Sequence, residues 1–102
     1  MNENDIDKRY LLLLNTSTVQ PEHAKIQTTL SKLSNDTSKP IYFDKHGGAF
    51  LFVTKLNAGQ ISARLEGILL NDDNYIIVEV GSDWFTFGNT KAATWFQKYI
   101  NR

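Results

Sequence analysis

The chain has 102 residues, of which 41% are apolar, including six Phe, four Tyr and two Trp. This length fits one domain, which can bury about two thirds of the surface of the unfolded chain. Eleven basic residues balance eleven acidic ones, so the net charge does not support nucleic acid or an acidic membrane as a partner. The chain has no cysteine, which excludes disulfides, thiolate metal sites and a cysteine nucleophile.

Residues 1–8 lack apolar periodicity, and we expect them to form a disordered leader before a single domain at residues 9–102. Their polar and acidic composition is unlike a signal peptide or a membrane anchor, so we expect a cytoplasmic protein with no membrane partner. Residues 10–14 are five consecutive apolar residues, too few to span a membrane but typical of a strand buried on both faces. We expect this strand in the middle of a sheet.

An amphipathic helical pattern follows and should begin close to Gln20, because Pro21 suits the first turn of a helix. Residues 34–40 end it, since small polar residues favour turns and Pro40 disfavours helical angles in the residue before it. The apolar residues predicted to pack this helix on a sheet are Ala24, Ile26, Leu30 and Leu33.

Two strand-like runs, residues 41–46 and 49–54, flank Gly47 and Gly48 and predict a hairpin with a glycine turn. The first run alternates apolar and polar residues, as on an edge strand. The second is apolar on both faces, so it should lie beside the strand at residues 10–14.

A second amphipathic helix is predicted from Asn57, whose side chain can cap the helix while Gln60 reaches back in a capping box. Residues 75–80 are rich in β-branched side chains and predict a further strand. An aromatic connection at residues 83–88 leads to a short final helix at residues 91–100, capped by Asn89 or Thr90.

This order of elements predicts an α+β fold of the ferredoxin-like βαββαβ type. It has a four-stranded antiparallel sheet with two helices on one face, plus a C-terminal helix. The first and third strands occupy the centre, and the residues expected to form the buried central layer are Leu12, Leu13, Leu51 and Phe52. Two helices cover one face only, so we expect a homodimer formed through the other face. The aromatic residues expected to contact the partner, or to complete the core of their own subunit, are Trp84, Phe85, Phe87 and Trp95.

Residues that could carry chemistry are scarce. Asp44 and His46 lie two apart on one strand and could form an acid–base pair, although two polar residues on an edge strand are an ordinary finding. Ser17 has no visible base partner, and we expect its hydroxyl to cap the first helix. Asp83 could bind a hard cation, but no calcium-loop spacing surrounds it. The sequence therefore predicts no metal site and no cofactor.

Three segments carry a resemblance to a known family: residues 10–15, residues 73–81 leading to Trp84, and residues 93–96. They resemble the SinR-type small proteins related to the CRISPR adaptation nuclease (Cas-two) and its toxin relatives. In the nuclease-like relatives, an aspartate closes the first strand and is proposed to hold a divalent metal between two subunits. The matching position here is Asn15, a poor ligand for Mg²⁺, which puts nuclease activity in doubt.

Two functions follow as hypotheses, and a third, a small-molecule sensor like other ferredoxin-like regulatory domains, has no signature in the sequence that would test it. The first is a non-catalytic binding or regulatory module, in phage defence or a toxin–antitoxin-like setting, with a second protein as an open option for its partner. The alternative is a metal-dependent endonuclease acting on RNA or DNA, with Asp44, His46 or Asp83 replacing the missing aspartate. A groove that gathers basic side chains would favour the nuclease, and the candidates for such a groove are Lys8, Arg9, Lys45, Lys55 and Arg64.

Overall fold

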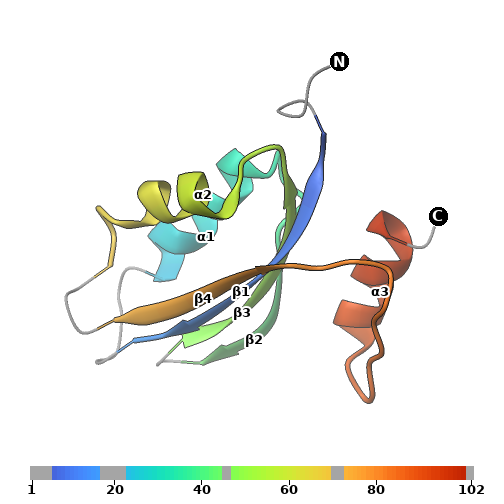
Figure 1. The fold of residues 1–102 in the computed structure, drawn as a ribbon. Coiled ribbons are helices and arrows are strands. Elements are labelled where there is room, and N and C mark those ends of the chain that lie inside the picture. Colours follow the sequence, from blue (N-terminus) through green and yellow to red (C-terminus); the bar gives the residue numbers. More distant parts are fainter. Residues whose placement is uncertain (1–5, 17–22, 45–46, 70–72, 101–102) are drawn as a thin grey trace.

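The computed structural model describes residues 6–16, 23–44, 47–69 and 73–100, and its elements follow the predicted order (Figure 1). They are β1 (Lys8–Asn15), α1 (His23–Leu33), β2 (Lys39–Asp44), β3 (Gly47–Thr54), α2 (Ala58–Leu65), β4 (Asn74–Glu79) and α3 (Thr90–Tyr99). None of these three helices has the length and apolar composition needed to cross a membrane. The expected start of the first helix near Gln20 and the expected cap at Ser17 lie outside the described residues.

The four strands form one antiparallel sheet in the order β2-β3-β1-β4. The predictions that β1 is central, that β3 lies beside it and that β2 is an edge strand are confirmed. Leu12 of β1 faces Phe50 of β3 on one side and Ile77 of β4 on the other. The molecule is thus a small α+β protein whose strand arrangement is compatible with a ferredoxin-like fold.

The inner face of the sheet is the face that α1 and α2 cover (Figure 1). Alternate side chains of β1 point to this face because strand residues two apart share a side. The phenol of Tyr10 donates a hydrogen bond to the carbonyl oxygen of Leu56 at 2.9 Å. The buried residues that form this core are Tyr10, Leu12, Leu14, Ile26, Leu30, Phe50, Phe52, Ile61 and Leu65.

The outer face of the sheet is the opposite one, and α3 packs on part of it (Figure 1). Leu51, Ala92 and Trp95 form a second buried cluster there. Arg9 Nε donates to the carbonyl oxygen of Tyr99 at 2.9 Å, which places a cation at the C-terminal end of α3, where the helix dipole favours positive charge. The C-terminal helix therefore packs on its own sheet.

The expectation that residues 10–14 are buried on both faces is wrong at Leu13. This side chain is 43% exposed, whereas its neighbour Leu12 is fully buried. The physical reason is that α3 packs against the part of the outer face around Leu11 and Leu51 and leaves the neighbouring part open. An apolar run shows that a strand can be buried on both faces, but not how far the next layer extends.

The glycine pair does not form the turn between the two hairpin strands. Gly47 and Gly48 lie inside β3, where they pair with Asp44 and Phe43, so the connection consists of residues 45–46, outside the described residues. Gly47 has a φ of +143°, and a Cβ atom added there would lie 2.0 Å from the carbonyl oxygen of Leu14. Glycine is required here because the backbones of β1 and β3 meet closely, and because other residues rarely adopt this φ.

Hydrogen bonds from capping side chains fix the starts of α2 and α3. The predicted capping box is confirmed: Asn57 Oδ1 accepts from the amide of Gln60 at 2.9 Å, and Gln60 Oε1 accepts from the amide of Asn57 at 2.8 Å. Asn89 caps α3 by accepting from the amide of Ala92 at 2.9 Å. Both signals are contained in a few neighbouring residues, which is why the sequence reveals them.

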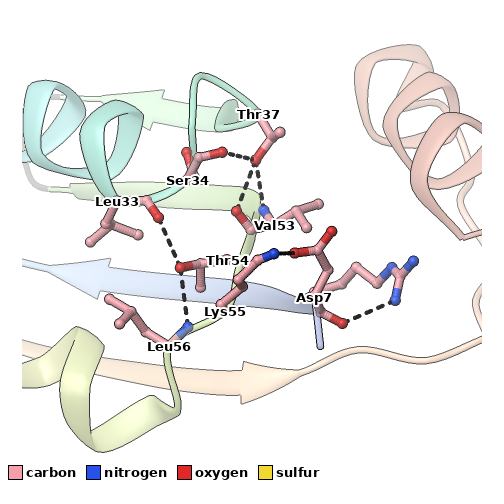
Figure 2. Close-up of polar contacts among 9 residues, drawn as sticks. Asp7, Leu33, Ser34, Thr37, Val53, Thr54, Lys55 and Leu56 are labelled. Carbon is pink, nitrogen blue, oxygen red and sulfur yellow. Dashed lines mark hydrogen bonds and ion pairs between the residues drawn. The ribbon is translucent and has the colours of Figure 1, made fainter. Parts of the chain in front are cut away.

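Two threonines join the end of α1 to β3, as Figure 2 shows. Thr37 Oγ1 accepts from the amide of Val53 at 2.8 Å and lies within donating distance of the carbonyl oxygens of Ser34 and Val53. The buried Thr54 donates its hydroxyl to the carbonyl oxygen of Leu33 at 2.8 Å. These bonds hold the turn between α1 and β2 against the end of the sheet.

Candidate functional site

The part of the outer face that α3 leaves open carries a continuous apolar row. Tyr42 of β2 pairs with Ala49 of β3, which pairs with Leu13 of β1, which pairs with Ile76 of β4. Three of these side chains are exposed, at 65% for Tyr42, 43% for Leu13 and 59% for Ile76. A row without charge across all four strands is unusual for a surface in contact with water.

A β-bulge on the edge strand adds to this row. The pairing of β2 with β3 shifts between Pro40 and Tyr42, so Ile41 is an extra residue. Ile41 packs against the cluster under α3, and Tyr42 lines the open part of the same face. The bulge thereby places two consecutive side chains on the outer face, where a regular strand would place one.

The connection from β4 to α3 brings further aromatic side chains to this face. The Trp84 ring stacks on Phe96 of α3, with ring centroids 4.7 Å apart and an interplanar angle of 12°. Phe85 and Phe87 follow and are 89% and 94% exposed. Two phenylalanines this exposed are costly in water, because burying each would stabilise by about 1.5 to 3 kcal/mol.

Together these residues surround a groove of about 360 Å³, which we name the outer groove. It is lined by Leu11, Leu13, Ile41, Tyr42, Ala49, Leu51, Phe85, Thr86, Phe87, Asn89, Ala92 and Phe96. This lining contains no carboxylate, imidazole or amine. The groove can therefore bind an apolar surface, and it contains no pair of groups suited to proton transfer.

The candidate residues for chemistry are only partly described. Ser17 and His46 lie outside the described residues, and Asp44 is placed only as the last residue of β2. Asn15 is exposed at the end of β1, in register with Gly47, which in turn pairs with Asp44. Asn15 and Asp44 thus lie at the same end of the sheet.

Asp83 belongs to the opposite end of the sheet. Val80, three residues before it, donates its amide to the carbonyl oxygen of Arg9 at 2.8 Å. Arg9 and Asn15 are separated by about 20 Å along β1, given the rise of a strand. Within the part of the chain that the structure describes, no three His, Cys, Asp or Glu side chains gather closely enough to hold a metal ion.

The basic residues considered for a nucleic-acid groove do not converge as a set. Lys55 and Arg64 line one hollow of about 460 Å³, but Asp7 lines it as well and lies 3.6 Å from Lys55 (Figure 2). Arg9 instead donates to Tyr99 at the end of α3. Lys8 is not among the residues that line the hollow, and Lys45 lies outside the described residues.

The four aromatic residues expected at a partner interface separate into two groups. Trp95 is buried within its own chain, at 4% exposure, and Trp84 is partly buried against Phe96. Phe85 and Phe87 stay exposed beside the outer groove. The aromatic segment is recognisable in the sequence, but Tyr42 and Ile76 join the same surface only through the strand register, which the sequence does not reveal.

The fold and surface define a small α+β protein with an open apolar groove on its sheet. No protein-family model matches the sequence, and no curated protein matches it. Among solved structures, the chain is similar to the NE2512 protein of unknown function from Nitrosomonas europaea, with 18% sequence identity. The match covers 80% of this chain and 97% of that one, with a TM-score of 0.39.

Proposed function

We propose that this protein is a non-catalytic binding module of ferredoxin-like fold that associates with a second copy through the outer groove. The observation that carries this proposal is the exposure of Phe85 and Phe87, at 89% and 94%, beside an apolar groove on the same face. The order of strands and helices supports the ferredoxin-like assignment.

A second copy fits this surface because the surface carries both exposed aromatic rings and an apolar groove that can bind such rings. In a two-fold symmetric dimer, each subunit contributes the same patch, so the Phe85 and Phe87 rings of one subunit can enter the groove of the other. Burial of a phenylalanine stabilises by about 1.5 to 3 kcal/mol, and the symmetric contact would bury two such rings from each subunit. The uncharged lining leaves no charge to be desolvated on association.

The relationship to the CRISPR adaptation nucleases is part of this proposal, and so is a role in phage defence. Binding is favoured over cleavage because the strand-end position holds Asn15, whose neutral amide is a poor ligand for Mg²⁺. Asp83, a replacement considered for the missing aspartate, follows the far end of the sheet from Asn15. The purified protein should therefore leave RNA and DNA intact with Mg²⁺ or Mn²⁺. Metal-dependent cleavage that disappears in Asp44→Ala or Asp83→Ala would overturn this part.

Sedimentation equilibrium at micromolar protein concentration tests the association. The wild-type chain should sediment at twice its mass of 11.6 kDa, and Phe87→Asp should sediment as a single chain. Phe87 is 94% exposed, so its replacement leaves the packing of the subunit intact. Ile6→Asp is the matched control, because Ile6 is an exposed apolar residue outside the outer groove and its replacement should leave the dimer unchanged.

Two outcomes would contradict the proposal. A wild-type protein that sediments as a single chain would remove the dimer. A dimer that persists in Phe87→Asp and in the double variant Phe85→Asp/Phe87→Asp would place the interface elsewhere and leave the outer groove without its assigned occupant.

A further inference from the structure

A third hollow, independent of the outer groove, lies between α3 and the turn that precedes β2. Its volume is about 290 Å³, and three lysines line it: Lys39 at the start of β2, and Lys91 and Lys98 of α3. We name it the lysine pocket. No other hollow described above has three cations in its lining.

The position of α3 creates this cluster. Lys91 and Lys98 are seven residues apart, which is close to two full turns, so both lie on one side of the helix with Thr94 between them. The indole of Trp95 donates to the carbonyl oxygen of Thr37 at 3.0 Å and holds that side of α3 against the turn. Lys39 follows two residues after Thr37 and so lies across the hollow from α3.

The pocket concentrates positive charge in a chain that has no net charge. Its lining carries three ammonium groups and a single carboxylate, that of Asp36. None of the three lysines makes an ion pair with another residue of the described ranges. Lys98 Nζ lies 5.3 Å from the centroid of the Tyr99 ring, at cation–π distance, and Tyr99 also lines the pocket. Like charges around one hollow repel one another, and a bound anion would relieve that repulsion.

We propose that the lysine pocket binds a small phosphate monoester. Lysine is a common binder of phosphate through its point charge, and a dianion can interact with several ammonium groups at once. The hydroxyls of Ser38 and Thr94, also in the lining, can donate hydrogen bonds to phosphate oxygens. The volume of about 290 Å³ lies at the small end of ligand sites, which favours a metabolite over a larger group.

The test is calorimetric titration of the whole chain with inorganic phosphate, with adenosine monophosphate and with glucose 6-phosphate, at low and at moderate salt. Binding of a monoester should weaken by about tenfold or more in Lys91→Gln and in Lys98→Gln, since each removes one charge-assisted contact. Lys32→Gln is the matched control. Lys32 is an exposed lysine in the last turn of α1 and does not line the pocket, so this variant should bind like the wild type.

Three results would overturn the inference. The first is no binding of any of the three phosphates at low salt. The second is binding that Lys91→Gln and Lys98→Gln leave unchanged. The third is that an oligonucleotide without a terminal phosphate binds more tightly than the monoesters and that this binding is lost in the same two variants. That result would identify a surface that binds a nucleic-acid strand. If adenosine monophosphate and glucose 6-phosphate bind with equal affinity, the pocket recognises the phosphate group. If one of them binds more tightly, the group attached to the phosphate contributes to recognition. Either result supports the proposed site.

Discussion

The indole nitrogen of Trp95 lies 3.0 Å from the carbonyl oxygen of Thr37, and this bond joins α3 to the turn between α1 and β2. Thr37 is in turn bonded through its hydroxyl to the backbone of Val53 in β3. Trp95 thus holds α3 to the turn, and Thr37 holds the turn to β3 in the sheet. Trp95 also contacts the rings of Phe96 and Tyr99, at centroid distances of 5.5 and 5.1 Å.

Two substitutions of Trp95 should lower the free energy of unfolding by different amounts. Trp95→Phe keeps a ring in the cluster but leaves the Thr37 carbonyl without this donor, which should cost about 1 to 3 kcal/mol. Trp95→Ala also leaves a cavity and should cost about 3 to 5 kcal/mol. Urea unfolding measures both. Trp84→Phe is the control, because Trp84 is only partly buried and should lose less than about 1 kcal/mol. Equal losses in Trp84→Phe and Trp95→Phe would contradict the role of the hydrogen bond.

Gly47→Ala should be strongly destabilising. The added Cβ would meet the Leu14 carbonyl oxygen at 2.0 Å, and the φ of +143° is one that alanine rarely adopts. We expect a loss of about 2 kcal/mol or more in the free energy of unfolding. Gly67→Ala is the comparison, since a Cβ at Gly67 meets nothing within 4 Å and should change stability by less than about 1 kcal/mol. Similar melting temperatures for the two variants would show that β1 and β3 do not approach as described.

Alanine substitutions of the neighbouring residues Leu12 and Leu13 in β1 should differ sharply in their effect on stability. Leu12 is fully buried on the inner face, so Leu12→Ala should cost about 2 to 5 kcal/mol. Leu13 is 43% exposed beside the outer groove, so Leu13→Ala should cost less, about 1 kcal/mol or below at concentrations where the chain is a monomer. Chemical denaturation of both variants in dilute solution makes the comparison. A larger loss for Leu13→Ala would mean that another part of the chain covers the outer face.

Stability should fall at alkaline pH through Tyr10. Burial raises the pKa of its phenol above the usual 10.0, and the Glu79 carboxylate adds to the rise. Above pH 10.0 the unfolded chain releases this proton more readily than the folded one, so the free energy of unfolding decreases as the pH rises. Tyr10→Phe should lose about 0.5 to 1.5 kcal/mol near neutral pH with its bond to Leu56, and should then decline less steeply above pH 10.0.

The control for this pH dependence is Tyr42→Phe. Tyr42 is 65% exposed in the single chain, so at concentrations where the chain is a monomer its replacement should leave the alkaline decline in stability as steep as in the wild type. Unfolding in urea at a series of pH values provides the measurement. An unchanged decline in Tyr10→Phe would assign the alkaline sensitivity to another group.

Local signals in the sequence were sufficient for much of the fold. The capping box of Asn57 and Gln60 spans four residues, and β3 could be placed beside β1 because both carry apolar runs. The glycine pair was misassigned because glycine serves both tight turns and close strand contacts, and only the register distinguishes them. The exposure of Leu13 depends on where α3 ends its contact with the sheet, which no local pattern encodes.

The candidate surfaces were harder to derive from the sequence. The aromatic connection was recognisable, and Phe85 and Phe87 are its exposed members. Trp95 looked equivalent to them, yet it is buried, since helical periodicity places it on the side of α3 that faces the sheet. The lysine pocket had one available signal, the seven-residue spacing of Lys91 and Lys98. Lys39 joins them only through the packing of α3, so the sequence could not reveal the site.

The order in which the chain is synthesised gives the position of α3 a further consequence. Leu11 and Leu51 leave the ribosome well before Trp95 and Ala92, which cover them in the finished molecule. At the usual pace of translation, this interval lasts roughly seconds, which is longer than the collapse of a short chain, so the apolar side chains of β1 and β3 emerge and wait uncovered for α3. A nascent chain of this protein would therefore be open to chaperone binding, and to premature contact with its neighbours on a polysome, until the last helix is complete.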